Sequence, residues 1–229
     1  MWIHEQLEQL PLIKYPFDIN RLPDNGIYFF YENGEIWNHG SNKLRIVRVG
    51  THKDGNFKSR IKGHYLLNET RMNFTSLMPP PHDTSILRKN IGRVLLNMTK
   101  DEYLNIWNLV FMKKEYRIKN AQLRDIPKEK KIESEISRIL RENFSFRFII
   151  IENQQDRMGS TGLESSLIGT IASCTYCKAS KNWLGKYSPI EKIRQSGLWQ
   201  VQHLGASTIS EEEMELITKS IKKTKNVYS

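Results

Sequence analysis

The chain has 229 residues, of which 35 are Lys or Arg and 25 are Asp or Glu, so its formal net charge is +10. Hydrophobic residues make up 38% and aromatic residues 10% of it, a composition that excludes a disordered chain and suits one substantial core. The basic excess favours a polyanionic partner such as nucleic acid over a neutral or acidic one, although a merely soluble basic protein stays open.

Neither a membrane nor a redox role is indicated. No apolar run approaches the ~20 residues of a membrane span. The N-terminal "MWIHEQLEQLPLIKY" lacks the basic leader and apolar core of a signal peptide, so we expect a cytoplasmic protein. Cys174 and Cys177 have no second Cys/His pair with zinc-site spacing, and a helix rather than a strand is predicted before them. We interpret both as structural cysteines.

The first half of the chain predicts a short helix followed by strands. The helix covers residues 2–10 and ends before Pro11. The β-forming run "GIYFFY" predicts a strand from Gly26. Residues 32–35 have hairpin-turn chemistry and would lead into a second short strand, "IWNH" (36–39). A further strand, "LRIVRVG", covers 44–50.

The rest of the chain is mostly helical by its apolar spacing. Helices are predicted at 56–67, 85–98, 101–107, 132–144 and 161–174, and one buried strand at 146–151. Asp83 or Thr84 is expected to cap the helix 85–98, and Ser210 with Glu213 predicts a capping box at a last helix. The charged stretch 112–131 is expected to be exposed. These elements predict one α/β (α+β) domain over residues 1–229, with few strands and several helices.

Four side chains in this framework have the chemistry of phosphodiester hydrolysis. Tyr28 lies in the first strand, Arg60 and His64 project from one helix face, and Glu164 is the lone carboxylate of an apolar helix. Tyrosine can position or deprotonate water, arginine can hold phosphate, and a carboxylate can hold a hard divalent cation. Each also has a structural interpretation, and Glu164 in particular could form a capping box with Thr161.

These residues resemble the motifs of the GIY-YIG nuclease superfamily. Its first motif stands here as Gly26-Ile27-Tyr28, and its second, usually Tyr-Ile-Gly, as Arg48-Val49-Gly50. The helix with the catalytic arginine looks like "NFKSRIKGHY", Glu164 in "GLESSLIGTI" matches the metal-binding glutamate, and Asn182 is similar to a supporting asparagine. The core resemblance covers residues 24–190, between an N-terminal helix and a C-terminal helical extension. Segments such as "SPIEKIRQSGLWQVQHL" look like one bacterial branch of the superfamily.

The resemblance implies a small three-stranded central sheet flanked by helices, and a DNA endonuclease that uses one Mg²⁺ or Mn²⁺ ion per site. Tyr28 would activate water, Arg60 would grip the phosphate, Glu164 would ligate the metal, and His64 would assist. Arg48 departs from the pattern, because an arginine cannot act as a base at neutral pH. It could instead favour ionised Tyr28 or contact phosphate.

We expect a restriction or defence nuclease acting on double-stranded DNA, and cutting both strands would need a homodimer or two binding events. The alternative is a catalytically impaired nucleic-acid-binding protein that retains the fold. Candidates for nucleic-acid contacts are His52, Lys53, Lys58, Arg88 and Lys89. His52 and His82 could also be incidental loop histidines, and the basic residues of 88–93 a solvated helix face.

Overall fold

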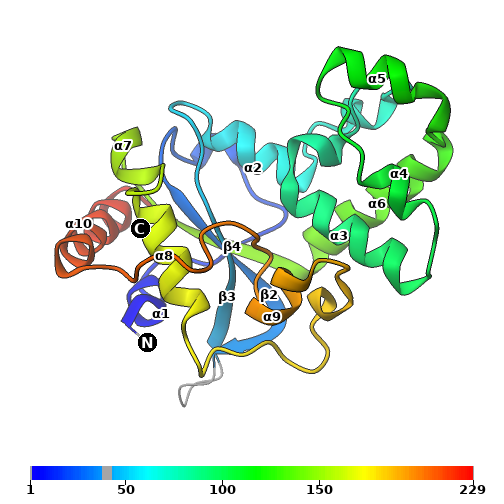
Figure 1. The fold of residues 1–229 in the computed structure, drawn as a ribbon. Helices are drawn as coiled ribbons and strands as arrows, with labels where there is room; N and C mark the ends of the chain where they lie inside the picture. Colours follow the sequence, from blue (N-terminus) through cyan, green and yellow to red (C-terminus); the bar gives the residue numbers. More distant parts are fainter. Residues whose placement is uncertain (1, 38–42, 229) are drawn as a thin grey trace.

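The computed structural model describes residues 2–37 and 43–228, and it has a mixed α/β fold around one antiparallel sheet (Figure 1). The sheet order is β1-β4-β2-β3. The strands are β1 (Ile13–Lys14), β2 (Ile27–Trp37), β3 (Lys43–Gly50) and β4 (Phe144–Ile149). The predicted fold class is confirmed. The sheet has four strands rather than three because the two-residue β1 pairs with the outer edge of β4.

Ten α-helices surround the sheet in the described residues. They are α1 (Trp2–Leu7), α2 (Phe57–Tyr65), α3 (Ile86–Met98), α4 (Leu104–Trp107), α5 (Lys114–Asn120), α6 (Ile126–Asn143), α7 (Gln154–Arg157), α8 (Leu163–Ala172), α9 (Glu191–Ser196) and α10 (Glu211–Tyr228). Five 3₁₀ helices connect them: η1 (Ile19–Arg21), η2 (Glu69–Asn73), η3 (Pro81–Thr84), η4 (Ala121–Leu123) and η5 (Leu184–Tyr187). Within residues 2–37 and 43–228, every helix is too short or too polar to cross a bilayer.

β2 is the central strand, and it continues through the predicted hairpin turn. Glu32 still pairs with Phe144 of β4, while the register between β2 and β3 shifts between Tyr31 and Ile36. Gly34 in this interval has φ of 83°. The prediction of a turn at 32–35 is therefore wrong. The Asn33-Gly34 pair instead lies at an irregular, bulge-like stretch within one longer strand. Residues 38 and 39 of the predicted strand "IWNH" lie outside the described residues.

The sheet separates two hydrophobic clusters, and the alternation of β2 distributes its side chains between them. Tyr28 and Phe30 belong to the cluster that includes α2, α3 and α6. Ile27, Phe29 and Tyr31 belong to the cluster on the other face, with α1, α8 and α10. In Figure 1 these two groups of helices lie to the right and to the left of the sheet. Tyr28 consequently faces α2, the helix that carries Arg60 and His64.

Two helix starts test the predicted caps. The cap of α3 is Ser85, whose Oγ accepts from the backbone N–H of Arg88 at 3.3 Å, so neither Asp83 nor Thr84 has the predicted role. The capping box of α10 is confirmed: the N–H of Ser210 donates to Glu213 Oε2 at 2.7 Å, and the N–H of Glu213 donates to Ser210 Oγ at 3.2 Å.

Candidate active site

Tyr28 and His64 meet in the interior between β2 and α2. Tyr28 Oη lies 3.0 Å from His64 Nε2, and His64 Nδ1 lies 2.7 Å from Ser85 Oγ at the start of α3. Tyr28 and His64 are fully buried. Burial, together with the neighbouring guanidinium groups of Arg60 and Arg48, holds the pKa of His64 well below its usual range. The imidazole is therefore neutral at physiological pH.

The motif glycine Gly50 leaves room for the Tyr28 ring. Gly50 pairs with Tyr28 across β2 and β3. A Cβ atom on Gly50 would lie 2.3 Å from Tyr28 Oη, which is far inside van der Waals contact. A Cβ on Gly26 would lie 2.5 Å from the carbonyl oxygen of Ile149. Both glycines are thus required by close packing around the tyrosine strand.

Arg48 is buried on the same sheet face, and it connects the site to the C-terminal part of the chain. It pairs with Phe30, two residues from Tyr28. Its Nη1 donates to the carbonyl oxygen of Trp199 at 2.5 Å, and the N–H of Trp199 donates to Val47 O at 2.8 Å. Burial lowers the pKa of Arg48, while Tyr28 and Glu164 nearby act in the opposite direction. Arg48 therefore stands between Tyr28 and the segment that follows α9.

Glu164 enters from α8, which packs against β3. Its Oε1 accepts from the N–H of Thr51 at 3.2 Å. The alternative capping box with Thr161 is not formed, because the helix cap is Gly162 and it makes no side-chain bond. Burial raises the pKa of Glu164, and Arg48, the Thr51 N–H and His203 oppose that rise. The carboxylate thus lies just beyond the end of β3, near the guanidinium groups of Arg48 and Arg60.

The donor set at Glu164 suits a single hard cation. Among the described residues, Oε2 of Glu164 makes no hydrogen bond, and no three His, Cys, Asp or Glu side chains cluster as metal ligands. Mg²⁺ is commonly bound through one or two carboxylates, with waters and substrate phosphate completing its octahedron. One carboxylate oxygen without a hydrogen-bond partner, next to the backbone of Thr51, fits that pattern.

A cleft of about 510 Å³ opens beside α2. It is lined by Thr51, His52, Lys53, Asn56, Ser59, Arg60, Gly63, Arg71, Thr84 and Met158. Arg60 is oriented by its Nη1, which donates to Thr84 O at 2.8 Å. The backbone N–H of Arg71 donates to Asn68 O at 3.2 Å, but its guanidinium forms neither a hydrogen bond nor an ion pair with any residue that the structure describes. Three cations and no carboxylate line this cleft, so it is suited to a polyanion.

This arrangement lies within a known domain. A family model described as "GIY-YIG domain" matches residues 3–227, nearly the whole chain. The chain belongs to the GIY-YIG domain family. Neither the curated proteins nor the solved structures contain a match. The family is one of nucleases, so the resemblance predicted from the motifs is confirmed.

The loop after β3 forms one wall of the cleft in this GIY-YIG domain, and Arg157 of α7 holds it. Arg157 is fully buried; it donates to His52 O at 2.6 Å and to Thr51 Oγ1 at 3.2 Å, and it pairs with Asp54. His52 and Lys53, two of the residues predicted to contact nucleic acid, line the cleft. Burial lowers the pKa of His52, with further lowering by the Arg157 and Arg60 charges.

Two predicted nucleic-acid contacts, Arg88 and Lys89, lie inside the GIY-YIG domain rather than on its surface. Arg88 is fully buried and donates through Nε and Nη2 to Glu133 Oε2, at 3.0 and 2.7 Å. Lys89 donates to Asp83 at 3.2 Å and to Leu109 O at 2.8 Å. The prediction of backbone contacts is wrong for both, because Arg88 is turned toward α6 and Lys89 toward Asp83 of η3 and the residues that follow α4. Lys58 remains near the surface, paired with Asp24 at 3.1 Å.

Asn182 and His82 also lie away from the Tyr28–His64 pair. Asn182 is exposed, and Ser180, two residues earlier, bonds Glu35 at 2.5 Å. Glu35 is seven residues along β2 from Tyr28, roughly 20 Å at ~3.3 Å per residue. The structure therefore does not bring Asn182 to the site. His82 is no loop histidine either, since it is buried, stacks on Trp107 and bonds Glu133 at 2.8 Å.

Four residues join the site without having been predicted. Ser85, Thr51 and Arg71 are described above, and His203 bonds Ser165, the neighbour of Glu164, at 3.2 Å. A serine directly before an apolar helix was an available signal for Ser85. For Thr51 and Arg71 only the basic, polar character of their loops was visible in the sequence. We find no feature of the sequence that predicts the contact of His203 with α8.

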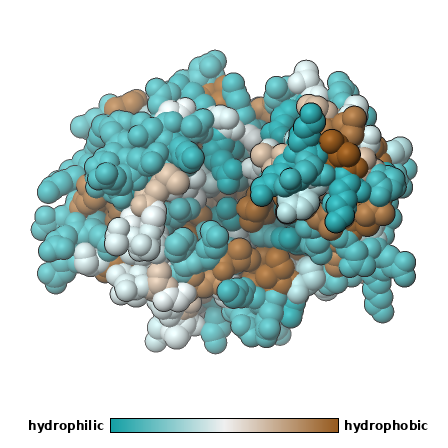
Figure 2. Space-filling view, turned by 45° about the horizontal axis from the view of Figure 1, so that its top comes forward, coloured by the Kyte–Doolittle hydropathy of each residue, from teal (hydrophilic) through white to brown (hydrophobic). Residues whose placement is uncertain are grey.

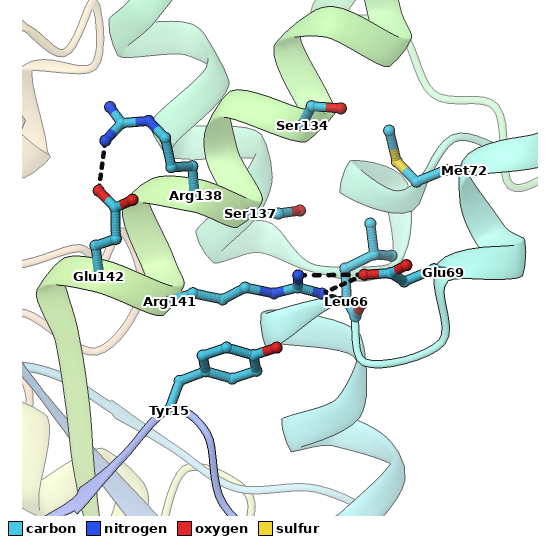
Figure 3. A pocket seen from close by; sticks show the side chains of 9 residues that line it. All are labelled: Tyr15, Leu66, Glu69, Met72, Ser134, Ser137, Arg138, Arg141 and Glu142. Carbon is cyan, nitrogen blue, oxygen red and sulfur yellow. Dashed lines mark hydrogen bonds and ion pairs between the residues drawn. The ribbon is translucent and has the colours of Figure 1, made fainter.

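A larger cavity of about 860 Å³ lies elsewhere, between α6, η2 and the end of α2 (Figure 3). In it Arg141 pairs with Glu69 at 3.2 Å and lies over the Tyr15 ring at 5.0 Å. Arg138 pairs with Glu142. Both of its arginines already have carboxylate partners, so we expect this cavity to bind phosphate more weakly than the cleft at Arg60.

Proposed function

We propose that this GIY-YIG protein is a divalent-cation-dependent endonuclease that hydrolyses DNA phosphodiester bonds at the cleft beside α2. The observation that carries the proposal is the 3.0 Å contact of Tyr28 Oη with His64 Nε2, beside a cleft where Arg60 is oriented by Thr84. Glu164 supplies a carboxylate with one free oxygen near the same cations. Together these provide a proton path, a phosphate clamp and a cation site.

In the proposed mechanism, Nδ1–H of His64 donates to Ser85 Oγ, and Nε2 is free to accept a proton from Tyr28 Oη. As water attacks phosphorus, its proton passes to Tyr28 Oη while the tyrosine proton passes to His64 Nε2. The bond from phosphorus to O3′ breaks, leaving a 5′-phosphate, and the departing O3′ takes a proton from water. Phosphate in the cleft would offset the Arg60 and Arg48 charges that disfavour imidazolium, so substrate itself would raise the basicity of His64.

Arg60 would hold the scissile phosphate in this scheme, and Glu164 would hold Mg²⁺ or Mn²⁺. The bound cation would supply neutralisation of the charge that develops on the phosphate oxygens. Arg60 suits this role because its guanidinium is oriented by the hydrogen bond from Nη1 to Thr84 O and also lines the cleft. Lys53 and Arg71 would contact neighbouring phosphates.

Duplex DNA and a restriction or defence role remain the expected substrate and context. The net charge of +10 and the acid-free cleft support a nucleic acid. A homodimer would place two cleavage sites on opposite strands. The cytoplasmic location expected from the sequence stays a prediction.

A second candidate function is nucleic-acid binding without cleavage. Two observations favour it: Tyr28 is fully buried, and Arg48 occupies the position of the usual second tyrosine. A tyrosine that accepts a proton from water must be reached by that water. If the Arg48 side chain stays in place over Tyr28 when DNA binds, the fold would bind a backbone and not cut it.

Plasmid nicking in Mg²⁺ or Mn²⁺ tests the proposal. We expect wild type to nick DNA, and Tyr28→Phe, Arg60→Ala and Glu164→Gln each to reduce the rate by about 10²-fold or more. Arg138→Ala is the matched control, because Arg138 is a half-exposed arginine outside the cleft. Equal nicking by wild type and all three site variants would identify a contaminant and overturn the site assignment.

Two binding measurements separate the candidates. Electron paramagnetic resonance of Mn²⁺ should detect binding to wild type and Arg60→Ala but weaker binding to Glu164→Gln, whose amide can still accept the Thr51 N–H. Fluorescence anisotropy with a labelled duplex in EDTA measures DNA affinity without cleavage. Salt-dependent DNA binding with no nicking in either cation would support the non-cleaving candidate.

A further inference from the structure

Residues 109–124 form an arm at one end of the molecule, which we call the α5 arm. It contains α5 and η4 and lies at the upper right of Figure 1, beyond the end of α2 and far from α10. Five of its residues are Lys or Arg and one is acidic, Glu115. Most of α5 is exposed, including Lys114 and Lys119, and so is Lys113, the residue before it. A seven-residue helix with so little burial is too short to be stable alone, so the arm depends on its attachments.

The basic residues of the arm divide into two groups. Arg117 and Arg124 are used internally: Arg117 donates to Phe111 O at 2.6 Å, and Arg124 donates to Glu129 and to the carbonyls of residues 75, 76 and 78. The side chains of Lys114 and Lys119 have no hydrogen bond or ion pair with other residues in the described part of the chain, and the Lys113 ammonium lies 5.6 Å from the centre of the Tyr116 ring. Three lysines therefore present uncompensated charge on a fixed support.

The support of the arm is continuous with the walls of the cleft. The N–H of Phe111 bonds Asp83, and the next residue, Thr84, is the one that orients Arg60. On the other side, Arg124 bonds the carbonyls of residues 75, 76 and 78, which follow η2 after Phe74, and η2 carries the cleft residue Arg71. One anchor of the arm is thus next to Thr84, which bonds the cleft residue Arg60, and the other lies a few residues along the chain from the cleft residue Arg71.

We infer that the α5 arm is a DNA-binding surface that contacts backbone phosphates beyond the scissile one, through Lys113, Lys114 and Lys119. This rests on the proposed function, since the arm extends the same binding track. A duplex carries one phosphate per ~3.4 Å on each strand, so DNA lying in the cleft continues past its edge. Lysines on an anchored arm would contact the phosphates of that DNA. Such contacts position the protein on the duplex but do not recognise its base sequence.

Exposed apolar side chains also occur on and around the arm, which is where Figure 2 shows brown groups among teal ones on the right-hand side. Val110, Met112, Tyr116, Ile118 and Leu123 are each between 42% and 59% exposed. Such a patch would also suit a second protein copy. We favour DNA because the lysines interrupt the apolar groups and would repel their own copies across a two-fold interface.

The test compares two matched triple variants in a Tyr28→Phe background, with EDTA present so that DNA stays intact. One is Lys113→Ala, Lys114→Ala, Lys119→Ala in the arm; the other is Lys219→Ala, Lys222→Ala, Lys223→Ala, which removes three exposed lysines of α10. Anisotropy of a labelled duplex is followed against salt. We expect the arm variant to lose about tenfold or more in affinity, and its plot of log affinity against log salt to flatten by about 2–3, since each phosphate contact contributes ~0.9. The α10 variant should match its parent.

Thermal unfolding of both triple variants should be close to that of the parent, because every substituted lysine is exposed and the surface ion pairs of Lys219 with Glu215 and of Lys223 with Glu152 contribute little to stability. Equal affinity and equal salt slope for the arm variant and its parent would overturn the inference while leaving the proposed function in place, provided that wild type still nicks plasmid DNA. Failure of wild type to bind DNA would overturn both. A shift of Ile118→Asp from dimer to monomer in sedimentation, with unchanged DNA binding by the arm lysine variant, would assign the arm to self-association instead.

Discussion

Arg48 donates to the carbonyl oxygen of Trp199 at 2.5 Å, across 151 residues of sequence. The contact joins the strand that follows the tyrosine motif to the segment between α9 and α10, which crosses beside α8 in Figure 1. It also explains why an arginine can stand inside an apolar strand. The residue is not solvent-facing; it satisfies a buried carbonyl at one end and lies beside Tyr28.

Replacing Arg48 tests whether it is a structural link, a part of the site, or both. Arg48→Met keeps most of the side-chain volume but leaves the Trp199 carbonyl without its donor. We expect a loss of about 1–3 kcal/mol in the free energy of unfolding, measured by urea denaturation, and slower plasmid nicking. Arg48→Lys should recover stability better than activity if the planar guanidinium matters for Tyr28. If Arg48→Met unfolds and nicks DNA like the wild type, the hydrogen bond between Arg48 and Trp199 matters for neither stability nor cleavage.

Gly50 offers a sharper test of the tyrosine position. In Gly50→Ala the added methyl would sit 2.3 Å from Tyr28 Oη, so the ring must move. We expect a loss of about 1–3 kcal/mol in unfolding free energy and a larger loss of nicking than stability alone explains, since the Tyr28–His64 contact is disrupted. The matched control is Gly205→Ala, which lies outside the cleft beside α2 and where an added Cβ meets nothing within 4 Å. If the two variants behave alike, close packing at Tyr28 is not what Gly50 provides.

What could be predicted from the sequence was local. A spacing of four residues places Arg60 and His64 on one helix face, and β-forming runs locate β2, β3 and β4. What failed depended on partners distant in sequence. The Asn33–Gly34 pair is equally suited to a hairpin turn and to an irregular strand, and only pairing of Glu32 with Phe144 decides between them. Arg48, likewise, is interpretable only when Trp199 is known to lie opposite.

The basic face of α3 shows the same limit. Arg88, Lys89 and Arg93 predict a solvated or DNA-facing stripe, yet Arg88 is buried against Glu133 of α6. Helical periodicity tells which residues share a face but not whether a charged face has a buried partner. That partner lies 45 residues away, within a segment predicted as an apolar-faced helix.

The buried Arg88–Glu133 pair leads to a prediction about stability rather than binding. Arg88→Met should lower the free energy of unfolding by about 3–5 kcal/mol, because it leaves Glu133 buried without its cation. The double variant Arg88→Met, Glu133→Leu should recover part of that loss, since it removes the uncompensated carboxylate. DNA affinity of folded Arg88→Met should equal that of wild type. A stable Arg88→Met protein with weakened DNA binding would instead restore the surface role predicted from the sequence.

Glu32 makes stability depend on pH in a direction opposite to that of most carboxylates. Its Oε2 accepts from the indole N–H groups of Trp183 and Trp199, at 2.9 and 2.8 Å. Burial raises the pKa of Glu32 to about 7, against the lowering by the two indoles. The folded protein therefore holds this proton in a range where the unfolded chain, with a pKa near its ordinary value, has lost it.

The favourable contribution of that proton is complete below the unfolded pKa and is lost as pH rises through the folded value near 7. Glu32→Gln cannot ionise, yet its amide oxygen can still accept from both indoles. Relative to wild type, Glu32→Gln should thus gain about 3 kcal/mol in unfolding free energy between about pH 4.5 and pH 8, measured by urea denaturation. Glu212→Gln, at an exposed position of α10, should show no such trend. A difference between wild type and Glu32→Gln that does not grow with pH would mean that Glu32 is ionised in the folded protein throughout, and that the two tryptophans hold a carboxylate rather than a carboxylic acid.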